Sequence, residues 1–159
     1  MTQEFLQDAV VEDLRELFKD YHLENSMGVR RRVHIFPQDV PIRQGDDDGT
    51  EPEAPPEPYV IVRLHGGSLP AQDERQIVKV ILVICVFDQD PNRQGYRDAL
   101  HIVNAIMTHY GENGIVANRY EVLHPIEWTP QEEDTHPYYF VAVAFDMNAP
   151  AIFKEVPET

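Results

Sequence analysis

Apolar side chains recur at intervals of three and four residues near the N-terminus of the chain. This spacing places them along one side of an α-helix, and it predicts a helix over residues 3–20. The apolar positions of this pattern are Phe5, Leu6, Ala9, Val10, Leu14, Leu17, Phe18 and Tyr21. Charged residues fill most of the other positions, so the opposite side of this helix is expected to face solvent.

Two segments in the middle of the chain have the composition of β-strands. Residues 59–64 are rich in β-branched side chains, and residues 75–88 contain a long apolar run. From residue 80 to residue 87 both alternating sets of positions are apolar, which predicts a central strand covered on both faces. Cys85 lies inside this run, and we expect it to be a small core residue because no local base would activate it.

A second helical pattern occupies residues 96–110, and a glycine follows it directly. Asp90 followed by Pro91 predicts the start of this helix. The carboxylate can accept hydrogen bonds from free backbone N–H groups, and proline is tolerated at the first helical position. Asp88 adds favourable charge near the same helix end.

The remaining elements complete a prediction of the fold class. Residues 115–128 and 136–147 have the composition of two strands joined by an acidic loop, and residues 29–36 are a possible short strand. This order of elements predicts an α+β fold with a mostly antiparallel sheet of four to five strands flanked by two helices. The length predicts a single domain over residues 1–159.

One segment is too polar to join a core. Residues 46–58 hold six acidic residues and four prolines, with no large apolar side chain. Such a segment cannot bury enough surface to offset the entropy of ordering it, so it predicts a mobile acidic loop at about residues 38–58. A run of carboxylates can bind cations, but this spacing matches no known calcium loop.

The formal net charge of -15 predicts a strongly acidic surface, which disfavours nonspecific binding to duplex nucleic acid. No basic segment followed by an apolar core marks an export signal, and no apolar stretch reaches the roughly 18 residues that a membrane helix needs. The single cysteine cannot form an internal disulfide. These features predict a cytoplasmic protein without membrane contact.

Three consecutive arginines stand out in this acidic chain. We expect Arg30, Arg31 and Arg32 to meet acidic groups, either in the same chain or on a neighbouring subunit, and contact with nucleic acid is the alternative. The residues predicted to lie at interfaces are Arg30, Arg31, Arg32, Asp46, Asp47, Asp48, Glu51, Glu53 and Glu57.

The sequence contains no recognised motif for catalysis or cofactor binding. No pair among the seven histidines has the helical spacing that presents two ligands to one metal ion. A calcium loop that began at Asp88 would have Arg93 in place of its glycine and Ala99 in place of its final glutamate. We therefore expect neither enzyme activity nor a cofactor.

A family resemblance lies in the second half of the chain. The segments "VFDQDPNRQGYRDALHIVNAIMTHY" and "RYEVLHPIEWTPQEEDTHPYYFVAVAFDMNAP", within residues 86–150, resemble tail terminator proteins of long-tailed bacteriophages and prophages, which complete the tail and join it to the head. The strand pattern from Tyr59 onward supports this resemblance. It implies an α+β fold and a structural role in virion assembly.

The resemblance also implies a set of partners. Proteins of this family form a ring, usually hexameric, on the end of the tail tube. The ring stops tube polymerisation and offers a docking surface to a head completion or connector protein. It is assembled in the bacterial cytoplasm and remains at the head-tail junction of the virion. DNA passes through the ring without tight binding, so we expect carboxylates to line the hole, some of them from residues 46–57.

Two alternatives stay open at this point. Another phage head-tail connector or neck protein would share nearly all of these features. A metal-dependent hydrolase that uses Asp88, Asp90 and a histidine is a more distant alternative.

Overall fold

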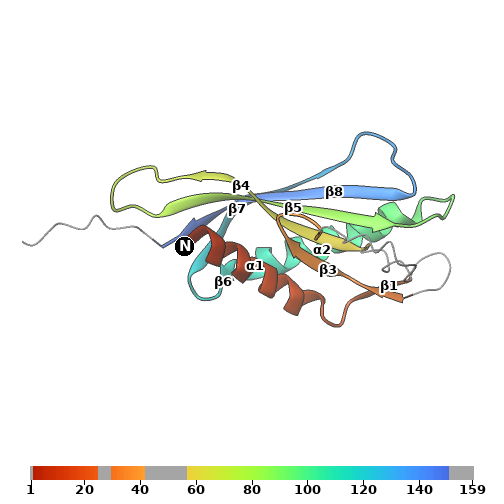
Figure 1. Cartoon of the computed structure of the whole chain (residues 1–159), viewed down its shortest axis with the longest axis horizontal. Helices are drawn as coiled ribbons and strands as arrows, with labels where there is room; N and C mark the ends of the chain where they lie inside the picture. The colour runs from red at the N-terminus through yellow and green to blue at the C-terminus, as the bar shows by residue number, and fades with distance from the viewer. Residues whose placement is uncertain (1, 25–29, 42–56, 151–159) are drawn as a thin grey trace, which may run out of the picture.

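The computed structural model describes residues 2–24, 30–41 and 57–150. These residues contain two helices and eight strands. In chain order (Figure 1) the elements are α1 (Thr2–Phe18), β1 (His22–Glu24), β2 (Arg30–Arg32), β3 (His34–Pro37), β4 (Tyr59–Ser68), β5 (Gln76–Phe87), α2 (Gln94–Glu112), β6 (Ile115–Val116), β7 (Tyr120–Pro130) and β8 (Tyr138–Ala149). Most of the predicted loop at residues 38–58 lies outside the described residues.

Six of the strands form one curled sheet in the order β3-β4-β5-β8-β7-β6, and β1 pairs with β2 in a separate ribbon. β3 and β4 are parallel, whereas all other neighbouring pairs are antiparallel. The α+β class is therefore confirmed. The predicted size of four to five strands was wrong, and the parallel pair was not predicted.

The predicted strand at residues 29–36 is in fact two strands with different partners. Arg30–Arg32 pairs with β1, and His34–Pro37 pairs with the first half of β4. Val33, between them, is 7% exposed and joins the core. The chain changes partner at this buried residue, which the apolar pattern of a single short segment does not reveal.

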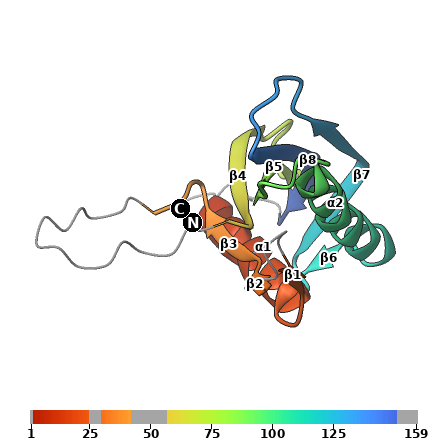
Figure 2. The ribbon, with the colours of Figure 1, turned by 90° about the vertical axis from the view of Figure 1, so that its right-hand side faces the viewer.

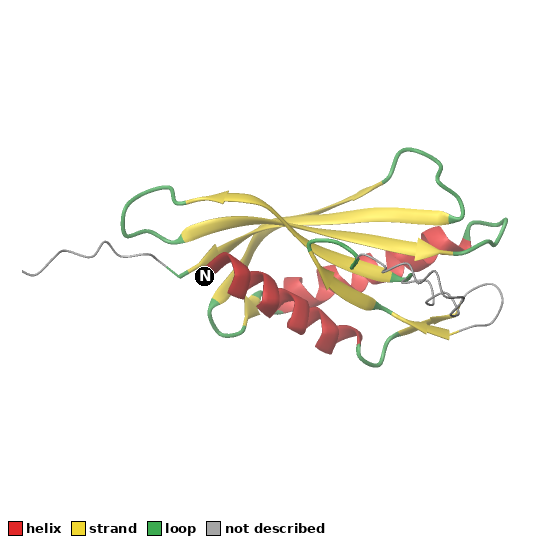
Figure 3. Ribbon diagram, in the orientation of Figure 1, coloured by secondary structure: helices red, strands yellow, loops and turns green. Residues whose placement is uncertain are grey.

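Both helices cover the same side of the sheet (Figures 2 and 3). α1 packs against β3 and β4, and α2 packs against β5 and β8. Alternate residues of β5, from Val78 to Ile84, point to this inner side and are at most 2% exposed. The helices and the sheet enclose one hydrophobic core.

The prediction that residues 80–87 are covered on both faces was wrong for the outer side of the sheet. Ile81, Val83 and Phe87 are only half-buried there, and no described helix lies over them. Cys85 is nevertheless 1% exposed, because its cross-strand neighbours Tyr59 and Phe140 flank it. Burial raises the pKa of the Cys85 thiol to about 12, as expected for a core residue.

The C-terminal strands also differ in detail from the sequence pattern. The predicted strand at residues 115–128 is broken after Val116, where Ala117 and Asn118 adopt positive φ angles of 53° and 55°. β7 then pairs with β8 in a register that shifts between Leu123 and Glu127. The tight turn and the shift leave β6 with two residues and β7 with eleven.

Candidate functional site

A network of polar and aromatic contacts lies at one end of the molecule, where the β7–β8 loop meets the start of α2. A groove of about 440 Å³ lies between them. We call it the acidic groove and define it by Tyr96, Glu132, Glu133, Asp134 and Tyr138, all of which line it. Tyr96 and Tyr138 are 40% and 41% exposed, so the groove presents aromatic surface beside its carboxylates.

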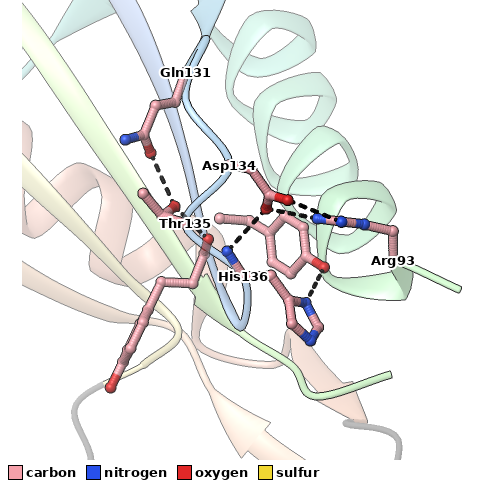
Figure 4. A network of polar contacts seen from close by, with 7 residues as sticks. Arg93, Gln131, Asp134, Thr135 and His136 are labelled. Atoms are coloured by element: carbon pink, nitrogen blue, oxygen red, sulfur yellow. Dashed lines mark hydrogen bonds and ion pairs between the residues drawn. The ribbon is translucent and has the colours of Figure 1, made fainter. Parts of the chain in front are cut away.

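One ion pair joins the start of α2 to the β7–β8 loop (Figure 4). Arg93 donates from Nη1 to Oδ1 of Asp134 at 2.7 Å and from Nη2 to Oδ2 at 2.9 Å. The backbone N–H of His136 donates to the same carboxylate at 3.1 Å. These donors, Arg93 first, lower the pKa of Asp134 to about 2.

Hydrogen bonds within the β7–β8 loop fix its path. The hydroxyl of Thr135 donates to the carbonyl oxygen of Tyr138 at 2.7 Å, and the N–H of Tyr138 donates back to the carbonyl oxygen of Thr135 at 2.9 Å. His136 Nδ1 lies 2.7 Å from the hydroxyl oxygen of Tyr139. Hydrogen bonds therefore hold the loop that carries the two remaining carboxylates, Glu132 and Glu133.

The turn that precedes α2 differs from the predicted helix cap. α2 begins at Gln94, and Arg93 occupies its N-cap in the left-handed conformation without a side-chain cap. The Asp90 carboxylate accepts instead from the N–H of Asn92 at 2.9 Å. The prediction that Asp90 caps this helix was wrong, because a turn after Pro91 delays the helix start.

A pair of buried carboxylates lies beside the same turn. Asp88 is 1% exposed, and its Oδ1 accepts from the N–H of Asp90 at 2.9 Å. Asp98 is 7% exposed and accepts from Gln94 at 3.1 Å. Burial first, and then the charge of Asp88, raise the pKa of Asp98.

The structure describes only some of the predicted interface residues. Arg31 is half-buried and lines a small cavity of about 90 Å³, which Glu57 and Asp98 of the same chain also line. Arg32 is exposed. Only the backbone of Arg30 is described, in β2. The remaining predicted residues lie outside the described part of the chain: Asp46, Asp47, Asp48, Glu51 and Glu53.

The acidic groove was not predicted as a site. Arg93 and Asp134 are 41 positions apart in the sequence, so their pairing follows only from the fold. The first local signal was the run of three acidic residues at 132–134, which the sequence pattern placed in a loop between two strands. Aromatic residues on both sides of that loop are the second signal, but they also suit strands.

The described residues contain neither a metal-binding cluster nor a membrane-spanning helix. No group of three or more His, Cys, Asp or Glu side chains could hold a metal ion there. Neither α1 nor α2 has the length and apolar character that a membrane-spanning helix requires.

Comparison with known proteins gives the fold but no family. No family model matches the sequence, and no curated protein matches it. Among solved structures 24 chains match. One of them, whose name states no function, has 12% identity and a TM-score of 0.56, and the alignment covers 99% of each chain. This similarity shows a shared fold over the whole length.

Proposed function

We propose that this protein is a tail terminator of a long-tailed phage or prophage. In this role it forms a ring on the end of the tail tube, stops tube polymerisation and provides the docking surface for the head connector. The sequence resemblance over residues 86–150 supports this specific assignment. The structural observation that carries the proposal is the apolar outer side of the sheet, which no described helix covers.

Two cross-strand rows make up this outer surface. Tyr59, Cys85 and Phe140 are partners across β4, β5 and β8, and Ile61, Val83 and Ala142 form the next row. At the strand ends, the rings of Phe87 and Tyr138 lie 5.1 Å apart. Ile61 and Cys85 are already buried in the single chain, whereas Tyr59, Val83, Phe140 and Ala142 are half-buried and supply the accessible apolar area. Contact between subunits would remove this apolar area from water and so favour assembly.

The charge of the chain supports the same role. With a net charge of -15, each subunit repels the phosphate backbone. A ring built from such subunits lets DNA pass without strong binding. Tight binding of duplex DNA by the purified protein at physiological salt would contradict this part of the proposal.

Growth of tail tubes in vitro tests the proposal. Purified tube protein from the same phage or prophage polymerises with and without this protein, and electron microscopy measures the tube lengths. We expect stoichiometric addition to stop growth and to place a ring on one tube end. Rings that leave tube growth unchanged would favour the alternative of another head-tail connector, and the absence of both rings and growth arrest would overturn the proposal.

Two matched variants separate the outer surface from general charge effects. Ala142→Asp places a charge in the apolar half of the outer side, whereas Lys79→Asp changes an exposed residue in its polar half. We expect Ala142→Asp to lose ring formation and growth arrest while its circular dichroism spectrum stays native. Lys79→Asp should retain both activities. Equal behaviour of the two variants would exclude the apolar surface as a subunit contact.

A further inference from the structure

We propose that the acidic groove of one copy receives Arg32 from the β1–β2 ribbon of a second copy. This inference rests on the proposed function, because it describes a contact between subunits of the ring. It assigns the partner of the arginine segment and gives the groove a defined occupant.

The groove contains two carboxylates without a bonding partner among the described residues. Asp134 is committed to Arg93 by two hydrogen bonds. Glu132 and Glu133 are exposed, and no described residue forms an ion pair or a side-chain hydrogen bond with either of them. The rings of Tyr96 and Tyr138 stand beside them with about two fifths of their surface exposed.

A guanidinium group suits this surface. Its planar fork donates to carboxylate oxygens, and its flat face stacks on aromatic rings. A lysine ammonium would satisfy the charge but not the stacking. The combination of unpaired glutamates and exposed tyrosines therefore favours an arginine as the occupant.

Arg32, Arg75 and Arg97 are exposed arginines whose side chains form no ion pair or hydrogen bond with a described residue. Position separates them. Arg97 follows Tyr96 of the groove on α2 and Arg75 lies before β5, whereas Arg32 lies in β2, opposite His22 and away from the elements of the groove. Neighbouring residues of a strand point to opposite sides, and Arg31 turns toward the cavity that Glu57 and Asp98 line. The alternation leaves Arg32 on the outer side of the ribbon.

The positions of the two surfaces fit a ring. The β1–β2 ribbon and the β7–β8 loop lie at the same end of the molecule in Figure 1, and on opposite sides of it in the end-on view of Figure 2. A cyclic assembly needs two different surfaces of each subunit at one level along its axis. Rotation about an axis along the length of the molecule can bring these two together.

The overall charge makes a local contact of opposite charge necessary. Two copies that each carry a net charge of -15 repel one another at a distance. A basic side chain entering a groove of glutamates offsets part of this repulsion and fixes the register of the contact. It also gives the assembly a dependence on ionic strength.

Charge reversal on each side tests the contact. We expect Arg32→Glu, and separately Glu132→Lys combined with Glu133→Lys, to weaken self-association at least about tenfold in analytical ultracentrifugation, because each change places like charges across the contact. The matched controls are Arg75→Glu and Glu74→Lys, exposed residues before β5 at the opposite end of the molecule. Both controls should associate like the unchanged protein.

Mixing the two defective variants gives the sharpest result. The Arg32→Glu variant keeps an intact groove, and the Glu132→Lys/Glu133→Lys variant keeps an intact arginine. In their mixture the native pair and the charge-reversed pair can alternate, and each joins opposite charges. We therefore expect mixed oligomers from two variants that each associate weakly alone. All three changes in one chain should restore part of the assembly through the reversed pair.

The outcomes separate this inference from the proposed function. If the unchanged protein stops tube growth while Arg32→Glu assembles normally, the inference is wrong and the terminator role stands. If mixing yields mixed oligomers but the unchanged protein does not stop tube growth, the contact exists and the terminator role fails. Monomeric variants that do not combine when mixed would also refute the inference.

Discussion

Gly95, in the first turn of α2, lies directly against the ring of Tyr139 on β8. A Cβ added to Gly95 would stand 2.5 Å from Cδ2 and 2.6 Å from Cε2 of that ring. Only the absence of a side chain allows the helix to approach β8 this closely. The contact places Arg93 and Tyr96 over the β7–β8 loop, and so it sets the position of one wall of the acidic groove.

Gly95→Ala should therefore lower the free energy of unfolding by about 1–3 kcal/mol, since the new methyl group must displace a packed ring. Gly111→Ala is the matched control on the same helix, because no atom lies within 4 Å of an added Cβ there. That change should be neutral or stabilise by up to about 1 kcal/mol through helix propensity. Urea unfolding of both variants checks the difference, and equal destabilisation would contradict the close contact.

The sequence predicted the elements that have a repeating local pattern and missed those that depend on distant parts of the chain. α1 and α2 were predicted almost to their ends, because amphipathic helices repeat a local pattern. The ribbon of β1 and β2 was missed because three-residue strands have no measurable period. The helix-free outer side of β5 was also missed. An apolar residue in the sequence does not show whether a helix, a neighbouring strand or a second subunit covers it.

The candidate site was less predictable than the fold for the same reason. Asp88 and Asp90 are separated by one residue in the sequence and were singled out as candidates, but the carboxylate of each accepts from a different backbone N–H of the turn. The pairing of Arg93 with Asp134 depends on the β7–β8 loop folding back onto α2, and no local pattern reports that. Arg31 and Arg32 read alike in the sequence, yet one is half-buried and the other exposed.

Arg93→Ala should raise the pKa of Asp134 from about 2 toward the ordinary value of about 3.9, because the two donated hydrogen bonds are lost. Carbon-detected NMR titration of the side-chain carboxyl measures this directly. The contribution of the pair to stability is present above the unfolded pKa and is lost as the pH falls through about 2. Arg97→Ala, an exposed change on the same helix, should leave the titration of Asp134 as it is; an equal rise would refute the specific pair.

Asp98→Asn should stabilise the protein, and more at neutral than at acidic pH. Burial raises the folded pKa of Asp98, so the folded state holds its proton to higher pH than the unfolded state does. Stability of the unchanged protein therefore falls as the pH rises from the unfolded pKa through the folded one. The amide carries no charge and escapes this loss.

Thermal unfolding of the Asp98→Asn variant and the unchanged protein is measured between pH 3 and pH 7, at about one pH value per unit. The difference in their stability is followed across this range. Asp8→Asn removes an exposed carboxylate from α1 and serves as the control, with an expected effect within about 0.5 kcal/mol. A gap between Asp98→Asn and the unchanged protein that does not grow with pH would show that Asp98 ionises as easily in the fold as out of it.

Calcium or magnesium at low millimolar concentration should leave the melting temperature unchanged. Asp88 and Asp90 each use one oxygen on a backbone N–H of the turn, and no metal-binding group of three ligands lies in the described residues. A rise in melting temperature that disappears in Asp88→Asn would instead favour the metal-dependent hydrolase.

The proposal that this protein ends the growth of the tail tube is tested most directly by the length of the tails made without it. Deletion of its gene from the phage or prophage, followed by electron microscopy of the lysate, provides the measurement. We predict tails of uncontrolled length that are not joined to heads, and restoration of normal tails by the unchanged gene supplied in trans. Tails of normal length joined to filled heads in the deletion strain would contradict the proposal.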